Sequence, residues 1–130
     1  MKTILAVSIL KTQTKIIVFR INNNKFIIKD VSILNKHIYE DVVLNKIQSI
    51  VKSYTINFIY ISIYKSFDKS KINLFFNNLE ISNIYYQSFL LDYNFNNKIS
   101  QNLSNGWIDF YKIQNIDIKI LIEYTIKSLK

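Results

Sequence analysis

The sequence predicts an α/β protein in which helices flank a mixed β-sheet. The central observation is the segment Phe58–Tyr64, which is apolar, β-branched or aromatic at almost every position. A strand has this composition when both of its faces are buried, and the amphipathic segments before and after it predict helices on each side. In such sheets ligands bind beyond the carboxyl ends of the strands. The polar loop Lys65–Ser70 is therefore the first candidate for function, and a solvated loop that caps the next helix is the alternative.

The length of 130 residues predicts a single domain, residues 1–130, that buries roughly two thirds of its unfolded surface. The absence of cysteine excludes a disulfide framework and a thiolate metal site, and it fits the cytoplasm, where we expect the protein to act. No apolar run approaches the ~20 residues of a membrane span, so we expect no membrane partner. Ile4–Leu10 follows Lys2 as in a short signal sequence. Because Lys11–Thr14 offers no small-residue cleavage site, we interpret the run as a strand.

The net charge of +8, with an isoelectric point near 9.6, suggests a polyanionic partner such as RNA or DNA. Codon usage is the alternative source of this charge. The commonest residues are Ile, Asn, Lys, Phe and Tyr, which A/T-rich codons encode, while Gly occurs once and Pro never. The composition therefore predicts nucleic-acid binding without establishing it.

Three apolar segments joined by short polar turns predict an antiparallel meander: Ile4–Leu10, Lys15–Ile21 and Lys25–Ile33. Apolar residues at helical spacing then predict an amphipathic helix over Tyr39–Tyr54. The buried strand Phe58–Tyr64 follows this helix.

A second helix is predicted around Ile72–Leu79, with Asp68 or Ser70 as its N-cap. The remaining elements are a strand over Ile84–Leu91, a short helix and loop over Asn94–Tyr111 and a closing helix over Ile116–Leu129. This order predicts a ribonuclease-H-like mixed five-stranded sheet flanked by helices. Right-handed crossovers place the fourth strand parallel beside the first.

Aspartates are the candidates for chemistry. Asp117 lies within an apolar stripe of the closing helix, where a carboxylate is costly unless it is paired or binds a ligand. The alternative is an exposed position in the first turn, where the helix dipole favours an acid. Asp92 ends the fifth strand and Asp68 lies in the loop after the fourth, and turn or cap chemistry is the alternative for both. The single histidine, His37, is predicted to lie on the surface.

Several motifs together resemble the YqgF (RuvX) family of pre-16S rRNA nucleases and Holliday-junction-resolvase-like proteins, over the whole chain. IYISIYKSFDKS, residues 59–70, is similar to the family's IVVGLPLNMDGS, which matches Asp68 and Ser70. LDYNFNN, residues 91–97, resembles the family's Asp-Glu-Arg segment through Asp92. NIDIKILI, residues 115–122, resembles its Val-Asp helix through Asp117, and ILAVS, residues 4–8, resembles Ile-Leu-Gly-Leu-Asp. No glycine-rich phosphate loop or serine nucleophile elbow is present.

The resemblance implies a cytoplasmic Mg²⁺-dependent nuclease that processes the 5′ end of pre-16S rRNA, with RNA or a ribosomal particle as partner. In that family converging acids hold Mg²⁺, which activates water and neutralises the phosphate. Asp117 and Asp92 are then the implied metal ligands. Ser8 and Tyr93 replace an expected aspartate and glutamate, and the family's Gly-Thr pair falls on Leu10 and Lys11. The resemblance therefore implies a degenerate catalytic site.

Three hypotheses follow from these patterns. The first is a degenerate nuclease in which Asp117, Asp92 and Ser8 converge at one edge of the sheet. The second is a non-catalytic RNA- or ribosome-binding protein of the same fold. The third is a subunit of the actin/hexokinase type, which the missing phosphate-loop glycines and second lobe oppose.

Overall fold

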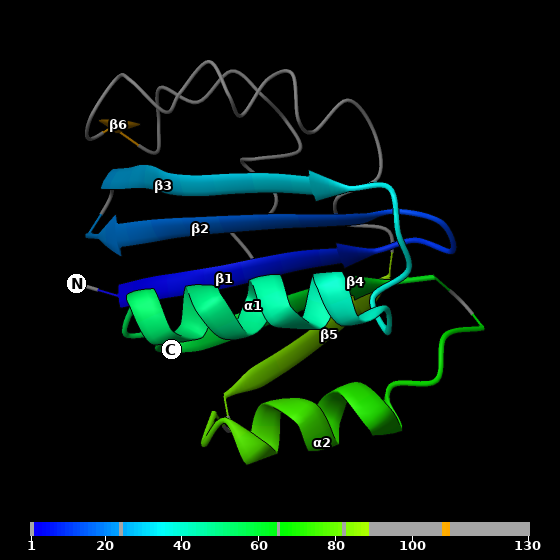
Figure 1. Ribbon diagram of the computed structural model, residues 1–130. Coiled ribbons are helices and arrows are strands. Elements are labelled where there is room, and N and C mark those ends of the chain that lie inside the picture. Colours follow the sequence, from blue (N-terminus) through cyan, green and yellow to red (C-terminus); the bar gives the residue numbers. More distant parts are fainter. Residues whose placement is uncertain (1, 24, 65, 82, 89–107, 110–130) are drawn as a thin grey trace.

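The computed structural model describes residues 2–23, 25–64, 66–81, 83–88 and 108–109 (Figure 1). Within these ranges the elements are β1 (Lys2–Ile9), β2 (Thr14–Asn22), β3 (Lys25–Leu34), α1 (Asp41–Ser53), β4 (Phe58–Ile63), α2 (Ser70–Asn78), β5 (Ile84–Ser88) and β6 (Ile108–Asp109). The strands form one mixed sheet in the order β5-β4-β1-β2-β3-β6. No helix in the described ranges is long and apolar enough to cross a membrane.

The strand register confirms the predicted connections. β1, β2 and β3 form an antiparallel meander, and β4 lies parallel beside β1. The turn between β2 and β3 contains Asn23 with φ of 56°, a left-handed conformation that asparagine adopts more readily than most residues. β5 in turn pairs parallel with β4. These pairings place β4 and β1 inside the sheet with a strand on either side, as the apolar composition of β4 predicts.

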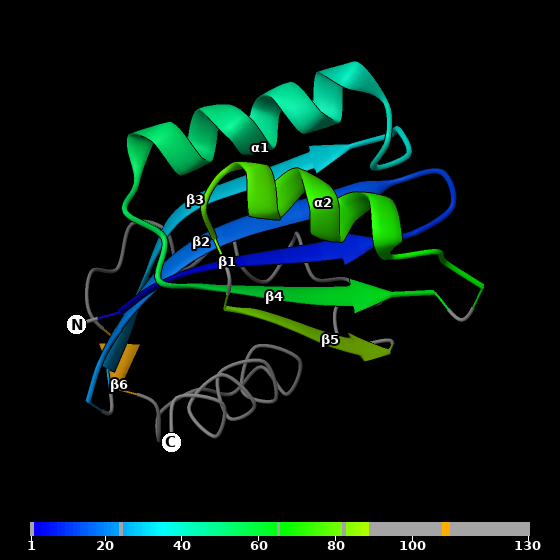
Figure 2. The same ribbon diagram turned by 90° about the horizontal axis from the view of Figure 1, so that it is seen from below.

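Both described helices pack on the same face of the sheet (Figure 2). Their core residues are the alternate, helix-facing side chains of the strands together with Val43, Ile47 and Ile50 of α1 and Ile72 and Phe76 of α2. Side chains on the other face of β1, β2 and β4 are buried as well. Burial on both faces explains the nearly continuous apolar runs of these strands.

The core side chain Phe76 should contribute strongly to stability. It is fully buried against the sheet, so Phe76→Ala should lower the free energy of unfolding by about 3–5 kcal/mol through lost burial and the cavity left behind. Leu74 on the same helix is 61% exposed, and Leu74→Ala should change stability by no more than about 0.5 kcal/mol. Urea denaturation of both variants measures the difference. Equal losses would show that α2 does not pack as described.

The carboxyl end of α2 forms a Schellman motif without glycine. The amide of Ile81 donates to the carbonyl of Phe76, and the amide of Glu80 donates to the carbonyl of Asn77. Glu80 provides the left-handed residue, with φ of 61°, where this motif usually has glycine. The motif directs the chain from α2 back toward the sheet and into β5.

Two predictions about the elements differ from the described part of the structure, and a third cannot be compared with it. Within the described residues the sheet has six strands rather than the predicted five, because Ile108 and Asp109 pair with Phe26 and Lys25 at the edge of β3. These two residues belong to the segment predicted as a short helix and loop. Helices on each side of the sheet are not found within the described ranges, where both helices cover one face. The predicted helix Ile116–Leu129 lies outside the described residues.

Candidate nucleic-acid interface

The carboxyl ends of β1, β3 and β4 meet at one edge of the sheet (Figure 2). β1 and β3 are both antiparallel to β2, so they run in the same direction as β4. α1 follows β3 and α2 follows β4, so both helices begin at this edge. Helix N-termini carry partial positive charge, and the fold therefore presents an edge suited to anions.

Four rings gather at this edge, and we call His37, Tyr39, Tyr64 and Phe67 the edge cluster. The rings of Tyr39 and Phe67 stack with centroids 5.5 Å apart, and Tyr64 meets Phe67 edge-on at 5.4 Å. The His37 ring lies 5.3 Å from Tyr39 and 6.3 Å from Tyr64. Offset and edge-to-face contacts of this kind fix the rings relative to one another. These ring contacts hold the segment before α1 against the segment after β4.

His37 organises the hydrogen bonds of the edge cluster. Its Nδ1 accepts the backbone amide of Tyr39 at 3.3 Å, and its Nε2 lies 3.1 Å from Tyr64 Oη. Because Nδ1 accepts, we assign the hydrogen of the neutral ring to Nε2, which donates to Tyr64. The Tyr64 hydroxyl thus accepts from His37, and its own hydrogen can be donated to another group. The predicted surface histidine is in fact half-buried, with its ring held between aromatic rings.

The backbone before α1 is held by Glu40, whose Oε2 accepts the amide of His37 at 3.0 Å. Glu40 is the N-cap residue of α1, and its own amide donates to the carbonyl of His37 at 3.1 Å, so the two bonds close a turn directly before the helix. The spacing His37-x-x-Glu40 in front of a helix was the signal in the sequence that could have indicated an ordered position for this histidine. Its contact with Tyr64, 27 residues away, has no such signal.

Asp68 and Ser70, the predicted loop residues, form a local turn at the same edge. Asp68 Oδ1 accepts the amide of Ser70 at 3.0 Å and its hydroxyl at 2.8 Å. These two hydrogen bonds hold the pKa of the Asp68 carboxyl below its usual value. Neither residue is the N-cap of α2, because that position belongs to Lys69. Turn chemistry, the alternative considered for Asp68, is therefore what the structure shows at this position.

Lysines lie over aromatic rings along this edge. Lys71 Nζ lies 4.8 Å from the ring centroid of Tyr39, and Lys69 Nζ lies 4.7 Å from that of Tyr86. Lys11 Nζ, from the turn after β1, lies 6.0 Å from the centroid of Tyr64. We call these three residues the edge lysines. Cations interleaved with aromatic rings are typical of surfaces that bind phosphate backbones and stack on bases.

Two tyrosines of this region keep their hydroxyl protons over a wide pH range. Burial raises the pKa of Tyr86 to about 12, and its hydroxyl hydrogen-bonds to Asn73 Oδ1. Burial also raises the pKa of Tyr39, whose hydroxyl donates to the carbonyl of Asp68 at 2.6 Å. Both side chains are therefore neutral at physiological pH and add no negative charge to the edge.

Ser8, the position of the expected first acid, lies on the face of the sheet opposite the helices. It is fully buried, and its cross-strand neighbours are Lys15 on β2 and Ser62 on β4. Directly opposed residues have Cβ atoms about 4.5–5.5 Å apart. Lys15 is only 6% exposed and Ser62 only 2%, and all three have interaction partners. Lys15 is thus buried in the same row as Ser8.

This row does not fit a divalent cation. Hydroxyls replace the carboxylates that Mg²⁺ prefers, and a buried ammonium repels a second positive charge nearby. Across the described ranges no group of three or more His, Cys, Asp or Glu could hold a metal ion. Asp117, Asp92 and Tyr93 lie outside the described residues, so their convergence with Ser8 stays a prediction. The described part of the chain supplies cations and hydroxyls to this edge rather than metal ligands.

No protein-family model matches the sequence, and a comparison with curated proteins finds no match. Two solved structures are similar. RuvC of T. thermophilus in complex with a Holliday junction substrate has a TM-score of 0.53 and 4% identity, over 79% of this chain and 75% of that chain. The Fowlpox virus resolvase in complex with Holliday junction DNA has a TM-score of 0.50 and 15% identity, over 93% of this chain and 86% of that chain. This similarity shows the ribonuclease-H-like fold of the Holliday-junction resolvases.

Proposed function

We propose that this protein is a resolvase-like protein of the nuclease class that binds branched nucleic acid at the edge where β1, β3 and β4 end. The observation that carries the proposal is the position of Lys11 and Lys71 over rings of the edge cluster, with Lys69 over the neighbouring ring of Tyr86, at the place where this fold binds ligands. Similarity to two resolvases solved with Holliday junctions supports a branched substrate over a linear one.

Each group at the edge has a defined role in this proposal. The edge lysines neutralise phosphates, and their binding is independent of sequence. The hydroxyl hydrogen of Tyr64, left free by the bond from His37, donates to a phosphate oxygen. The rings of Tyr39 and Tyr64 present apolar surface to bases or sugars that are unstacked at a branch point.

Hydrolysis of the phosphodiester bond is expected to be weak. Mg²⁺ would supply water activation and charge neutralisation, and the family resemblance implies Asp117 and Asp92 as its ligands. The row of Ser8, Lys15 and Ser62 does not fit that ion, so binding rather than cleavage is the dominant activity proposed.

Processing of the 5′ end of pre-16S rRNA in the cytoplasm is the narrower function that the YqgF resemblance implies. The observation in its favour is the loop containing Asp68 and Ser70, which lies at the edge beside the lysines. A non-catalytic protein that binds RNA or ribosomal particles would use the same surface. Both remain predictions alongside the branched-substrate proposal.

Binding to three probes tests the proposed function: a four-way DNA junction, a linear duplex with the same arm sequences, and a precursor rRNA fragment. We expect the junction to bind at least about tenfold more tightly than the duplex, with or without EDTA. The reason is that the phosphate backbones of several arms come together at the branch point and can contact the edge at the same time. Fluorescence anisotropy gives the affinities, and gel analysis of the same samples with Mg²⁺ reports cleavage. Equal affinity for junction and duplex would contradict the proposal. Preference for the rRNA fragment would favour the narrower function.

A further inference from the structure

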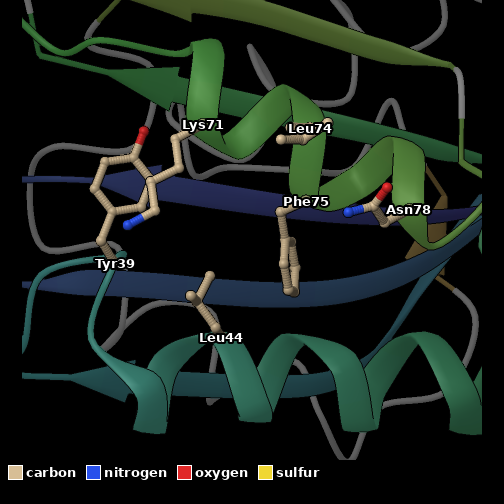
Figure 3. Close-up of a pocket in the computed structure, with 6 residues that line it drawn as sticks. All are labelled: Tyr39, Leu44, Lys71, Leu74, Phe75 and Asn78. Atoms are coloured by element: carbon tan, nitrogen blue, oxygen red, sulfur yellow. The ribbon is translucent and has the colours of Figure 1, made fainter.

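A small apolar cavity opens between α1 and α2. It has a volume of about 210 Å³ and is lined by Tyr39, Leu44, Lys71, Leu74, Phe75 and Asn78 (Figure 3). Figure 3 shows Leu44 and Phe75 pointing into the space between the helices, with Tyr39 and Lys71 at one end and Asn78 at the other. Cavities that enclose drug-sized ligands measure roughly 300–1,000 Å³, so this one suits a smaller group.

The lining combines aromatic walls with one amide and one cation. Phe75 offers a ring surface, Tyr39 offers the edge of a ring that Phe67 and Lys71 cover, and Leu44 and Leu74 offer aliphatic surface. Asn78 is exposed at the rim, where its amide can both donate and accept hydrogen bonds. A planar heterocycle with donors and acceptors on its edge matches this combination, and an unpaired nucleobase is such a group.

The cavity is continuous with the proposed nucleic-acid interface. Tyr39 belongs both to the cavity and to the edge cluster, and its ring is held by the bond from its hydroxyl to the Asp68 carbonyl. Lys71 lies over that ring at the mouth, where it can contact a phosphate next to an inserted base. The chain's net charge of +8 favours a polyanionic occupant over a basic one.

We propose that the cavity between α1 and α2 binds one unpaired nucleobase of the nucleic acid held at the edge, with Lys71 on its phosphate. This inference rests on the proposed function and adds a base-binding subsite to it. Stacking on an aromatic side chain does not depend on base identity, because every base has a π-face. The subsite therefore selects unpaired bases, which branch points and bulges supply, without selecting sequence.

Two matched tryptophan variants test the subsite. Leu74 lines the cavity and is 61% exposed, so Leu74→Trp should fill the cavity without disturbing the core. Val42 of α1 is 48% exposed and does not line the cavity, so Val42→Trp is the control. The probes are two four-way DNA junctions, one with a single unpaired adenine at the branch point and one with an abasic residue there. Thermal unfolding by circular dichroism checks that both variants fold.

We expect the parent and Val42→Trp to bind the adenine junction about tenfold more tightly than the abasic junction. Leu74→Trp should lose this preference and retain the affinity for the abasic junction. Equal binding of both probes by the parent would overturn the subsite while leaving the proposed function intact, whereas no binding of either probe would overturn the proposed function itself. A concentration-dependent dimer of the parent, abolished in Leu74→Trp, would assign the cavity to a second copy and also overturn the subsite.

Discussion

Mg²⁺-dependent cleavage of a four-way junction should rise at least about a hundredfold when Ser8→Asp and Tyr93→Glu are combined with Lys15→Gln. The first two substitutions restore acids where the family resemblance expects them. A metal ion at such a site contributes several kcal/mol of transition-state stabilisation, and each ~1.4 kcal/mol is a factor of ten in rate. Single-turnover cleavage with and without Mg²⁺ measures the gain.

The structure adds Lys15 to this experiment. With Lys15 retained, a new aspartate at position 8 faces the ammonium directly across the strand pair and should form an ion pair instead of a metal site. The Ser8→Asp and Tyr93→Glu double variant should therefore stay nearly inactive, since groups that act as one unit are not additive. Efficient Mg²⁺-dependent cleavage by the parent protein, unchanged by Asp117→Asn, would show that the site has been placed wrongly.

Junction affinity should fall steeply with salt, and the edge lysines should account for a large part of that fall. Each phosphate neutralised contributes about 0.9 to the slope of log affinity against log salt on duplex arms and about 0.7 on single strands. Replacing Lys11, Lys69 and Lys71 with glutamine should flatten the slope by about 0.9 per lysine on duplex arms. Anisotropy titrations between 50 and 200 mM NaCl give the slope.

The matched control removes the same charge elsewhere. Lys25 begins β3 at the opposite end of the sheet, Lys29 is exposed in the middle of β3, and Lys52 lies in the last turn of α1. Replacing these three with glutamine should change the slope much less. If the two triple variants behave alike, the binding is diffuse and the edge has no special role. A slope near zero for the parent would attribute the net charge to codon usage.

Local patterns in the sequence were sufficient to predict the order of the described elements from β1 to β5 and the parallel pairing of β4 with β1. They failed where contacts between distant segments determine the position or burial of a residue. The ordered, half-buried position of His37 was missed because its partner Tyr64 lies 27 residues away in the sequence. The burial of Lys15 beside Ser8 depends on the register of the β1–β2 hairpin. The alternation of apolar and polar residues along the two strands does not by itself fix that register. The two-residue strand β6 has no pattern long enough to detect.

The candidate site was predictable only in outline. The rule that ligands bind at the carboxyl ends of strands directed attention to the loop containing Asp68 and Ser70, and the edge lysines and aromatic rings do gather there. Which rings and cations meet could not be deduced, because they come from four separate segments. Asp117 and Asp92, identified through the family resemblance, stay predictions.

The Schellman motif at the end of α2 has an evolutionary consequence. A left-handed residue with a Cβ atom, such as Glu80, is strained by roughly 1 kcal/mol relative to glycine. A lineage whose codons drift toward A and T loses glycine, and it accumulates such penalties one helix end at a time. Because a small domain has only about 5–15 kcal/mol in reserve, a few of these sites leave little tolerance for further mutation.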